Sequence, residues 1–222
     1  MKKVFILAIA FVMQTAVAQV TKNLGDFNTV KVYDKLNVKL IAGSENKVII
    51  TGSREQEVEA VNNNGELKLR MPFPKLLSGN DIKIQLYYKK IDGVDANEGA
   101  YVSSDDTFDA TIMDLNAREG AEIHLILDVD KVNIKSVTGG IIALEGKATN
   151  QEVTIMTGGV LESKNLITNQ TTISVSAGGS AEVNASVLVD AKVKAGGSVY
   201  IYGKPKQINK KTVLGGTIEE KN

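Results

Sequence analysis

Apolar and polar residues alternate in short segments through the first part of the chain, a pattern typical of half-buried strands. Residues 38–41 and 48–50 are two such segments with a short polar loop between them, which predicts a hairpin. Asn64-Gly65 also stands between two alternating segments. Because Asn and Gly can both take the left-handed conformations of a type I′ turn, this pair predicts a second hairpin. Residues 82–86 alternate as a further strand.

From residue 91 the alternation becomes periodic, with glycines that recur at intervals of 21, 19, 19, 20, 18 and 19 residues. The leading glycines are Gly99, Gly120, Gly139, Gly158, Gly178, Gly196 and Gly215. Five of them are followed by a second glycine, namely Gly140, Gly159, Gly179, Gly197 and Gly216, and the other two by Ala100 and Ala121. The glycines are therefore predicted to form the corners of a repeating unit, where the chain must turn in little space.

Mostly apolar residues recur five and three positions before the first six leading glycines, with Ser136 as the polar exception, and three positions after all seven. Period two within a unit and period nineteen between units predict a single-stranded parallel β-helix, a solenoid with coils of about 19 residues. Its crossovers should be right-handed, as parallel connections generally are. An antiparallel sandwich or barrel is the alternative, but turns every 8–12 residues would then be expected.

These patterns divide the chain into a leader and one β domain. We predict a signal peptide at residues 1–18, strands and hairpins at 19–90, repeat coils at 91–203 and a C-terminal cap at 204–222. Four lysines and a proline within residues 204–211 are residue types that protect the open edge of a sheet, which is the reason to place the cap there.

The first eighteen residues carry Lys2 and Lys3, then an apolar run and an A-x-A site that ends at Ala18. This segment is predicted to be a signal peptide that directs export and is cleaved after Ala18. No later stretch is long and apolar enough to span a membrane. Without Lys2 and Lys3, the 26 basic residues become 24 against 26 acidic ones, a net charge near −2 that gives no reason to bind nucleic acid. Cysteine is absent, so thiolate metal sites are excluded.

Few residues indicate catalytic chemistry. His124 is the only histidine and should point outward, which makes a zinc site or a Ser-His-Asp triad improbable. Asp105, Asp106, Asp109 and Asp114 form the densest acidic cluster, and Asp128-Val129-Asp130 has a D-x-D spacing. Paired carboxylates could hold calcium or cleave a glycan, but residues 105–108 read as a loop, and Asp128 and Asp130 fall where turns are expected. The glycine pairs lead into strands rather than helices, so they are not phosphate loops. We therefore predict no cofactor and no metal.

Tyr200 and Tyr202 share one face of the last full coil, because residues two apart in a strand point the same way. They could stack on a sugar, or they could instead seal the apolar end of the coil.

The apolar leader, the Asn64-Gly65 turn, the Gly-Gly repeats and the closing Tyr202-Gly203-Lys204-Pro205 segment together resemble the putative auto-transporter adhesin, head GIN domain family. This resemblance covers nearly all of residues 19–222 and implies a secreted bacterial protein with a right-handed parallel β-helix. It supplies no catalytic residues. The sequence ends seven residues after Gly215, so no C-terminal translocator barrel is expected within it.

Together these observations predict an exported, non-enzymatic, adhesin-like protein of the periplasm or cell surface. It would present an extended β-helix face to a glycan or to a cell-surface protein. The alternatives are a polysaccharide-processing β-helix enzyme and a purely structural periplasmic module. The sequence does not indicate an oligomeric state.

Overall fold

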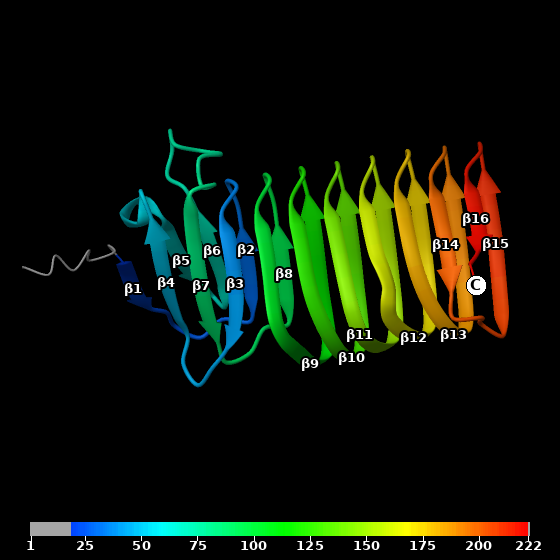
Figure 1. The fold of residues 1–222 in the computed structure, drawn as a ribbon, viewed down its shortest axis with the longest axis horizontal. Helices are drawn as coiled ribbons and strands as arrows, with labels where there is room; N and C mark the ends of the chain where they lie inside the picture. The colour runs from blue at the N-terminus through cyan, green and yellow to red at the C-terminus, as the bar shows by residue number, and fades with distance from the viewer. Residues whose placement is uncertain (1–18, 222) are drawn as a thin grey trace, which may run out of the picture.

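The chain forms an elongated β-solenoid in the computed structural model, which describes residues 19–221 (Figure 1). The predicted fold class is thereby confirmed. The predicted signal peptide, residues 1–18, lies outside the described residues.

The regular part of the solenoid consists of long strands that pair in parallel with the next long strand along the chain. Each long strand bends halfway, and the two halves lie on opposite sides of the coil (Figure 1). We call the side formed by the first halves the first sheet and the side formed by the second halves the second sheet. The strands are β9 (Tyr101–Arg118), β10 (Glu122–Val137), β11 (Ile141–Met156), β12 (Val160–Ser176) and β13 (Ser180–Lys194).

The last coils are made of shorter strands. β14 (Ser198–Tyr202) pairs with the first half of β13, and β15 (Gln207–Val213) pairs with its second half. β16 (Thr217–Glu220) then adds to β14 and ends the first sheet.

Successive coils are joined by a sharp turn that contains the leading glycine. At Thr138 and Gly139 the φ angles are +51° and +73°, and the Gly140 amide donates to the Val137 carbonyl at 3.0 Å, as in a type I′ turn. The second glycine has a different role. A Cβ atom on Gly140 would lie 2.3 Å from the Ala117 carbonyl oxygen, so this position requires a residue without a side chain.

The same turn recurs along one edge of the solenoid. Positive φ angles are found at Glu98-Gly99, Glu119-Gly120, Thr157-Gly158, Ala177-Gly178, Ala195-Gly196 and Leu214-Gly215. A Cβ at the second glycine of the later pairs, Gly159, Gly179, Gly197 and Gly216, would meet another atom at 2.3 to 2.8 Å.

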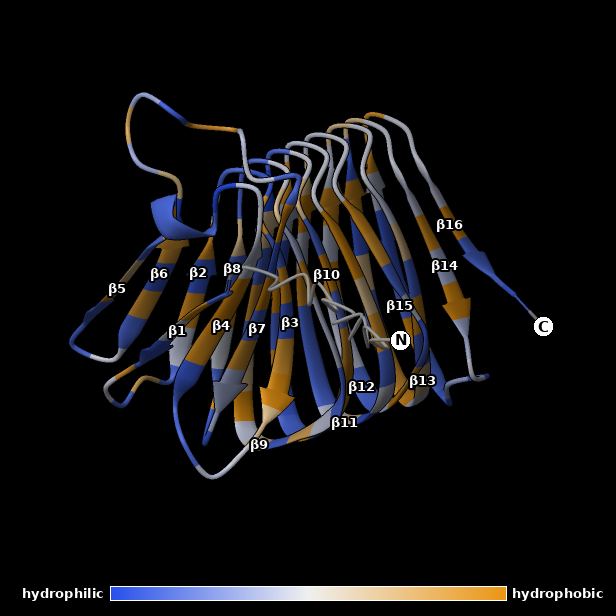
Figure 2. Cartoon of the chain, turned by 60° about the vertical axis from the view of Figure 1, so that its left-hand side comes forward, coloured by the Kyte–Doolittle hydropathy of each residue, from blue (hydrophilic) through white to orange (hydrophobic). Residues whose placement is uncertain are grey.

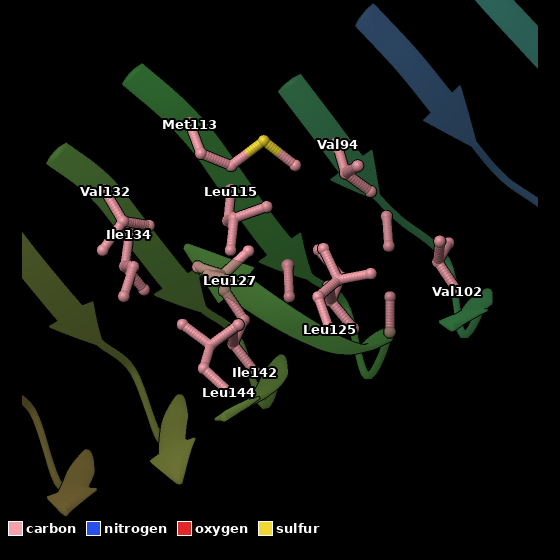
Figure 3. Close-up of a cluster of buried hydrophobic side chains, with 14 of the residues drawn as sticks. Val94, Val102, Met113, Leu115, Leu125, Leu127, Val132, Ile134, Ile142 and Leu144 are labelled. Atoms are coloured by element: carbon pink, nitrogen blue, oxygen red, sulfur yellow. The ribbon is translucent and has the colours of Figure 1, made fainter. Parts of the chain in front are cut away.

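Inward side chains of the two sheets form one apolar core. The apolar residues that contribute to it are coloured orange along the strands in Figure 2. Figure 3 shows Leu125, Leu127 and Ile142 of the first sheet facing Leu115 and Ile134 of the second. All of them are at most 4% exposed. Each such side chain contributes about 1.5–3 kcal/mol through burial.

The N-terminal part follows the same coil geometry but not the same order. Its elements are β1 (Gln19–Asn23), β2 (Thr29–Val32), β3 (Asn37–Ala42), β4 (Lys47–Gly52), the 3₁₀ helix η1 (Glu55–Glu57), β5 (Glu59–Asn63), β6 (Glu66–Arg70), β7 (Ile82–Tyr88) and β8 (Gly93–Ala96). β2 and β3 form a coil that lies between the coil of β6 and β7 and the coil of β8 and β9.

One predicted hairpin is confirmed and the other is wrong. β5 and β6 pair antiparallel around Asn64-Gly65, with φ angles of +51° and +86° at these two residues. The predicted hairpin of residues 38–41 and 48–50 does not form, because β7 lies between β3 and β4. β3 instead pairs in parallel with β7 and β9, and β4 pairs antiparallel with β7 and β1.

The core contains a small polar network where two coils differ in length. The pairing of β12 with β13 shifts register between Ser163 and Ile167 and again after Thr168. The Ser163 and Thr168 hydroxyls donate to the carbonyls of Glu182 and Asn184 at 2.7 and 2.8 Å. These hydroxyl groups provide donors at the point where the backbone ladder is interrupted.

Charged residues take inward positions in the last coil. Lys210 is in register with the buried Ala191, and Glu220 is in register with the buried Ile201. Across the coil, Lys210 Nζ and Glu220 Oε1 lie 2.7 Å apart. This ion pair stands where earlier coils have apolar side chains, while Ile208 and Ile218 of the same coil still pack against the core. Charged groups at the open end of a sheet disfavour edge association.

Candidate functional site

Most of the tyrosines lie on the outer face of the first sheet. Tyr87, Tyr101, Tyr200 and Tyr202 all occupy outward positions there and are half-buried, a surface that we call the tyrosine face. Of the other two tyrosines, Tyr33 follows β2 in the second sheet, and Tyr88 is buried and stacks on Phe108 with 5.2 Å between ring centroids. The two sides of the solenoid therefore differ in the chemistry that they present.

A shallow depression of about 390 Å³ lies on the tyrosine face beside Tyr200. It forms over one row of registered residues, in which Ala143 is followed by Glu162, Glu182 and Tyr200 on successive strands. The small side chain of Ala143 leaves a hollow that the longer side chains border. Lys164 and Asn165 complete its edge.

Carboxylate oxygens and hydroxyl groups surround this hollow. The Tyr202 hydroxyl donates to Glu182 Oε1 at 3.3 Å. Lys221 lies over the Tyr200 ring, with Nζ 4.9 Å from its centroid, and a hydrogen bond with Glu219 raises the pKa of Lys221. Carboxylates accept hydrogen bonds from hydroxyl groups and an aromatic ring packs against apolar C–H surface, so this arrangement suits a hydroxylated ligand such as a sugar.

Tyr200 and Tyr202 thus lie on one outward face, as predicted, and both are half-buried. Local patterns in the sequence do not indicate that Ala143, Glu162 and Glu182 are neighbours of Tyr200. The nineteen-residue period brings their strands together, and this was the signal that could have revealed them.

His124 is outward, as expected, and sits beside Glu122 with 3.3 Å between Nε2 and Oε2. Its ring lies 5.1 Å from the Tyr101 ring, centroid to centroid.

Only some of the acidic candidates converge. Asp109, Asp128 and Asp130 line one shallow depression together with Lys147, and Asp109, Asp128 and Lys147 are in register on successive strands. Asp105 forms an ion pair with Lys39, and Asp106 accepts from the Ala42 amide at 2.8 Å. Asp128 Oδ2 lies 3.1 Å from Lys147 Nζ. Within residues 19–221, no group of three or more His, Cys, Asp or Glu side chains could hold a metal ion. The predicted corner glycines lie at the sharp turns described above.

The part of the chain that the structure describes contains no helix that is long and apolar enough to cross a membrane.

The family described as "Putative auto-transporter adhesin, head GIN domain" matches residues 26–205. The chain belongs to this family. The match covers the whole of β2 to β14, so the tyrosine face of this head GIN domain lies almost entirely within it. No curated protein matches the chain.

Solved structures share the fold of this head GIN domain. A putative adhesin from Bacteroides fragilis is 20% identical with a TM-score of 0.85, covering 94% of this chain and 98% of its own. A putative adhesin from Parabacteroides distasonis is 18% identical with a TM-score of 0.74, covering 92% and 97%. A protein from the same organism described as a putative lipid binding protein is 11% identical with a TM-score of 0.67, covering 92% and 96%. At these identities the likeness shows the fold alone.

Proposed function

We propose that this head GIN domain is an exported, non-enzymatic, adhesin-like protein that binds a glycan on its tyrosine face. The observation that carries the proposal is the depression in which Tyr200 lies beside Glu162 and Glu182. Membership of a family described as adhesins supports a binding role.

The length of the tyrosine face favours an extended ligand. Tyr101 on β9 and Tyr200 on β14 are five strands apart, roughly 24 Å at the usual strand spacing of about 4.8 Å. A polymer could therefore contact several outward rows at once, and weak contacts along the face would add.

A glycan array with purified residues 19–222 tests the proposal. Binding to one or more glycans is expected, and Tyr200→Ala should weaken it at least about tenfold, equivalent to about 1.4 kcal/mol. Tyr33→Ala is the matched control, because it removes a half-buried tyrosine from the second-sheet side. Product analysis on each bound glycan should find no cleavage.

Three outcomes would overturn the proposal. If no glycan on the array binds, the proposed ligand class is wrong. If Tyr200→Ala and Tyr33→Ala lose the same amount of binding, the ligand does not bind on the tyrosine face. If a bound glycan is cleaved, the protein is an enzyme rather than a binding protein.

A further inference from the structure

The loop between β6 and β7 carries apolar side chains into solvent. It projects beyond the row of sharp turns near the N-terminal end of the solenoid (Figures 1 and 2). Phe73 is 86% exposed, and Leu76 and Leu77 are each 50% exposed. The solenoid core does not cover these side chains, although the core begins again at Ile82, which is fully buried.

A buried carboxylate holds the loop in place. Asp34 is 1% exposed, and its two carboxylate oxygens accept from the amides of Met71 and Leu77, both at 2.9 Å. Its backbone carbonyl accepts from the Gly79 amide, also at 2.9 Å. The loop is therefore fixed at three points along its length rather than loosely attached.

The backbone at Leu77 is strained in this arrangement. Its φ angle is +59°, a left-handed conformation that is unfavourable for a residue with a Cβ. A short polar residue such as Asn takes it more readily. An anchored, strained loop that keeps two leucines exposed is pre-organised for contact with something outside the chain.

A groove of about 440 Å³ lies between this loop and the first sharp turns, and we call it the loop groove. Leu76 and Leu77 line one side, and Lys35, Glu98, Gly99 and Glu119 line the other. Two carboxylates thus stand opposite two leucines.

The loop groove carries more negative than positive charge, because Glu98 and Glu119 outnumber Lys35 among its lining residues. Among the described residues, no Lys, Arg or His nitrogen lies within 4.0 Å of a carboxylate oxygen of Glu98 or Glu119. Burial, followed by the neighbouring Asp34 carboxylate, raises the pKa of the Glu98 carboxyl above its ordinary value of 4.5. A cation brought next to Glu98 would relieve this cost.

We propose that the loop groove binds a segment of another protein that carries an apolar side chain next to a lysine or arginine. The apolar side chain would pack against Leu76 and Leu77, and the cation would pair with Glu98 and Glu119. An anionic bilayer suits the groove less well, because the two carboxylates would face lipid headgroups of the same charge. This site is separate from the tyrosine face.

An array of synthetic decapeptides probed with purified residues 19–222 tests the proposal. One set places Leu or Phe next to Arg or Lys, a second replaces the basic residue by Gln, and a third replaces the apolar residue by Ser. The first set is expected to bind at least about tenfold more tightly than either of the others. Equal binding of all three sets would overturn the proposal.

Variants of the groove locate the binding. Leu76→Ser combined with Leu77→Asn removes the apolar side, and Asn accepts the positive φ at position 77. Glu98→Gln combined with Glu119→Gln removes the charge. Each of these two double variants should bind the peptides at least tenfold more weakly than the parent chain, while its circular dichroism spectrum stays unchanged.

Leu214→Asn is the matched control, because Leu214 is 86% exposed with a φ of +57° at the opposite end of the solenoid. It should bind peptides as the parent chain does, and so should Tyr200→Ala, which separates this site from the glycan site. A loss in Leu214→Asn equal to that in the groove variants would overturn the assignment.

Vesicle flotation tests whether the loop groove binds a lipid bilayer instead of a protein segment. Vesicles of phosphatidylethanolamine and phosphatidylglycerol should not retain the chain. The proposal would be overturned if the vesicles retain the chain, Phe73→Ser abolishes this retention and no peptide binds. The loop would then be a membrane-binding segment.

Discussion

The regular coils and the N-terminal region follow one geometry with two different chain orders. From β9 to β13, each strand pairs with the next strand in the sequence. Before β9, the coil of β2 and β3 lies between strands that come later in the sequence. Both regions use the same left-handed turn, which in β2–β3 is formed by Asp34 and Lys35, each with a φ of +60° and neither a glycine.

The difference shows what the repeat requires and what it does not. A left-handed pair of residues and alternating inward side chains are enough to make one coil. Glycine directly after the left-handed pair is needed only where neighbouring coils approach closely, as at Gly140. In the N-terminal region the constraint lies elsewhere, in the buried Asp34 that fixes a long loop.

The largest effect is expected from a substitution at the second glycine of the regular coils. Gly140→Ala places a Cβ 2.3 Å from the Ala117 carbonyl oxygen, so the backbone must move, and we expect a loss of about 3 kcal/mol in the free energy of unfolding. Gly139→Ala meets nothing within 4 Å and should cost only about 1 kcal/mol, for the positive φ of +73°. Urea unfolding of both variants measures the two losses. Equal losses would mean that the two glycines have the same role.

The N-terminal region should respond most to the loss of its buried carboxylate. Asp34→Asn keeps the size and the left-handed conformation but leaves one of the Met71 and Leu77 amides without an acceptor, which should cost about 2 kcal/mol. Faster hydrogen exchange at these two amides, together with urea unfolding, measures the change. Asp105→Asn alters a side chain that is 81% exposed and serves as the control, with an expected change within about 0.5 kcal/mol. Unchanged exchange in Asp34→Asn would show that the loop does not depend on this anchor.

The smallest effect is expected at Glu98, where the two regions join. Burial and the Asp34 carboxylate raise the folded-state pKa of Glu98 above 4.5. Ionisation of the Glu98 carboxyl as the pH rises therefore destabilises the folded state relative to the unfolded state. Glu98→Gln removes this cost. The variant should therefore unfold at a higher temperature than the parent chain at neutral pH, and the difference should vanish below the ordinary glutamate pKa. Thermal unfolding across this pH range tests the sign, and a difference that grows toward acid pH would contradict it.

Much of the fold could be predicted from local patterns. The nineteen-residue spacing of the glycines, the alternation within each unit and the Asn64-Gly65 turn all concern residues whose conformations are set by their own chemistry. The outward direction of Tyr200, Tyr202 and His124 follows from the same period of two.

Other features depended on which strand edges were available. Residues 38–41 and 48–50 read as a hairpin, yet β7 occupies the edge of β3 that β4 would have used. No local signal in either segment encodes this choice, because the partner lies some forty residues later in the chain. The hollow at Ala143 likewise depends on side chains from three later coils.

By itself, the sequence determined the β-solenoid, its coil length, its glycine turns and the direction of its outward tyrosines. Only the tertiary structure decided the order of the N-terminal coils, the buried anchor at Asp34 and the groups that surround Tyr200. The physical reason is that dihedral preference and alternation act over a few residues. Pairing, burial and charge balance are instead settled between segments that meet only once the chain has folded.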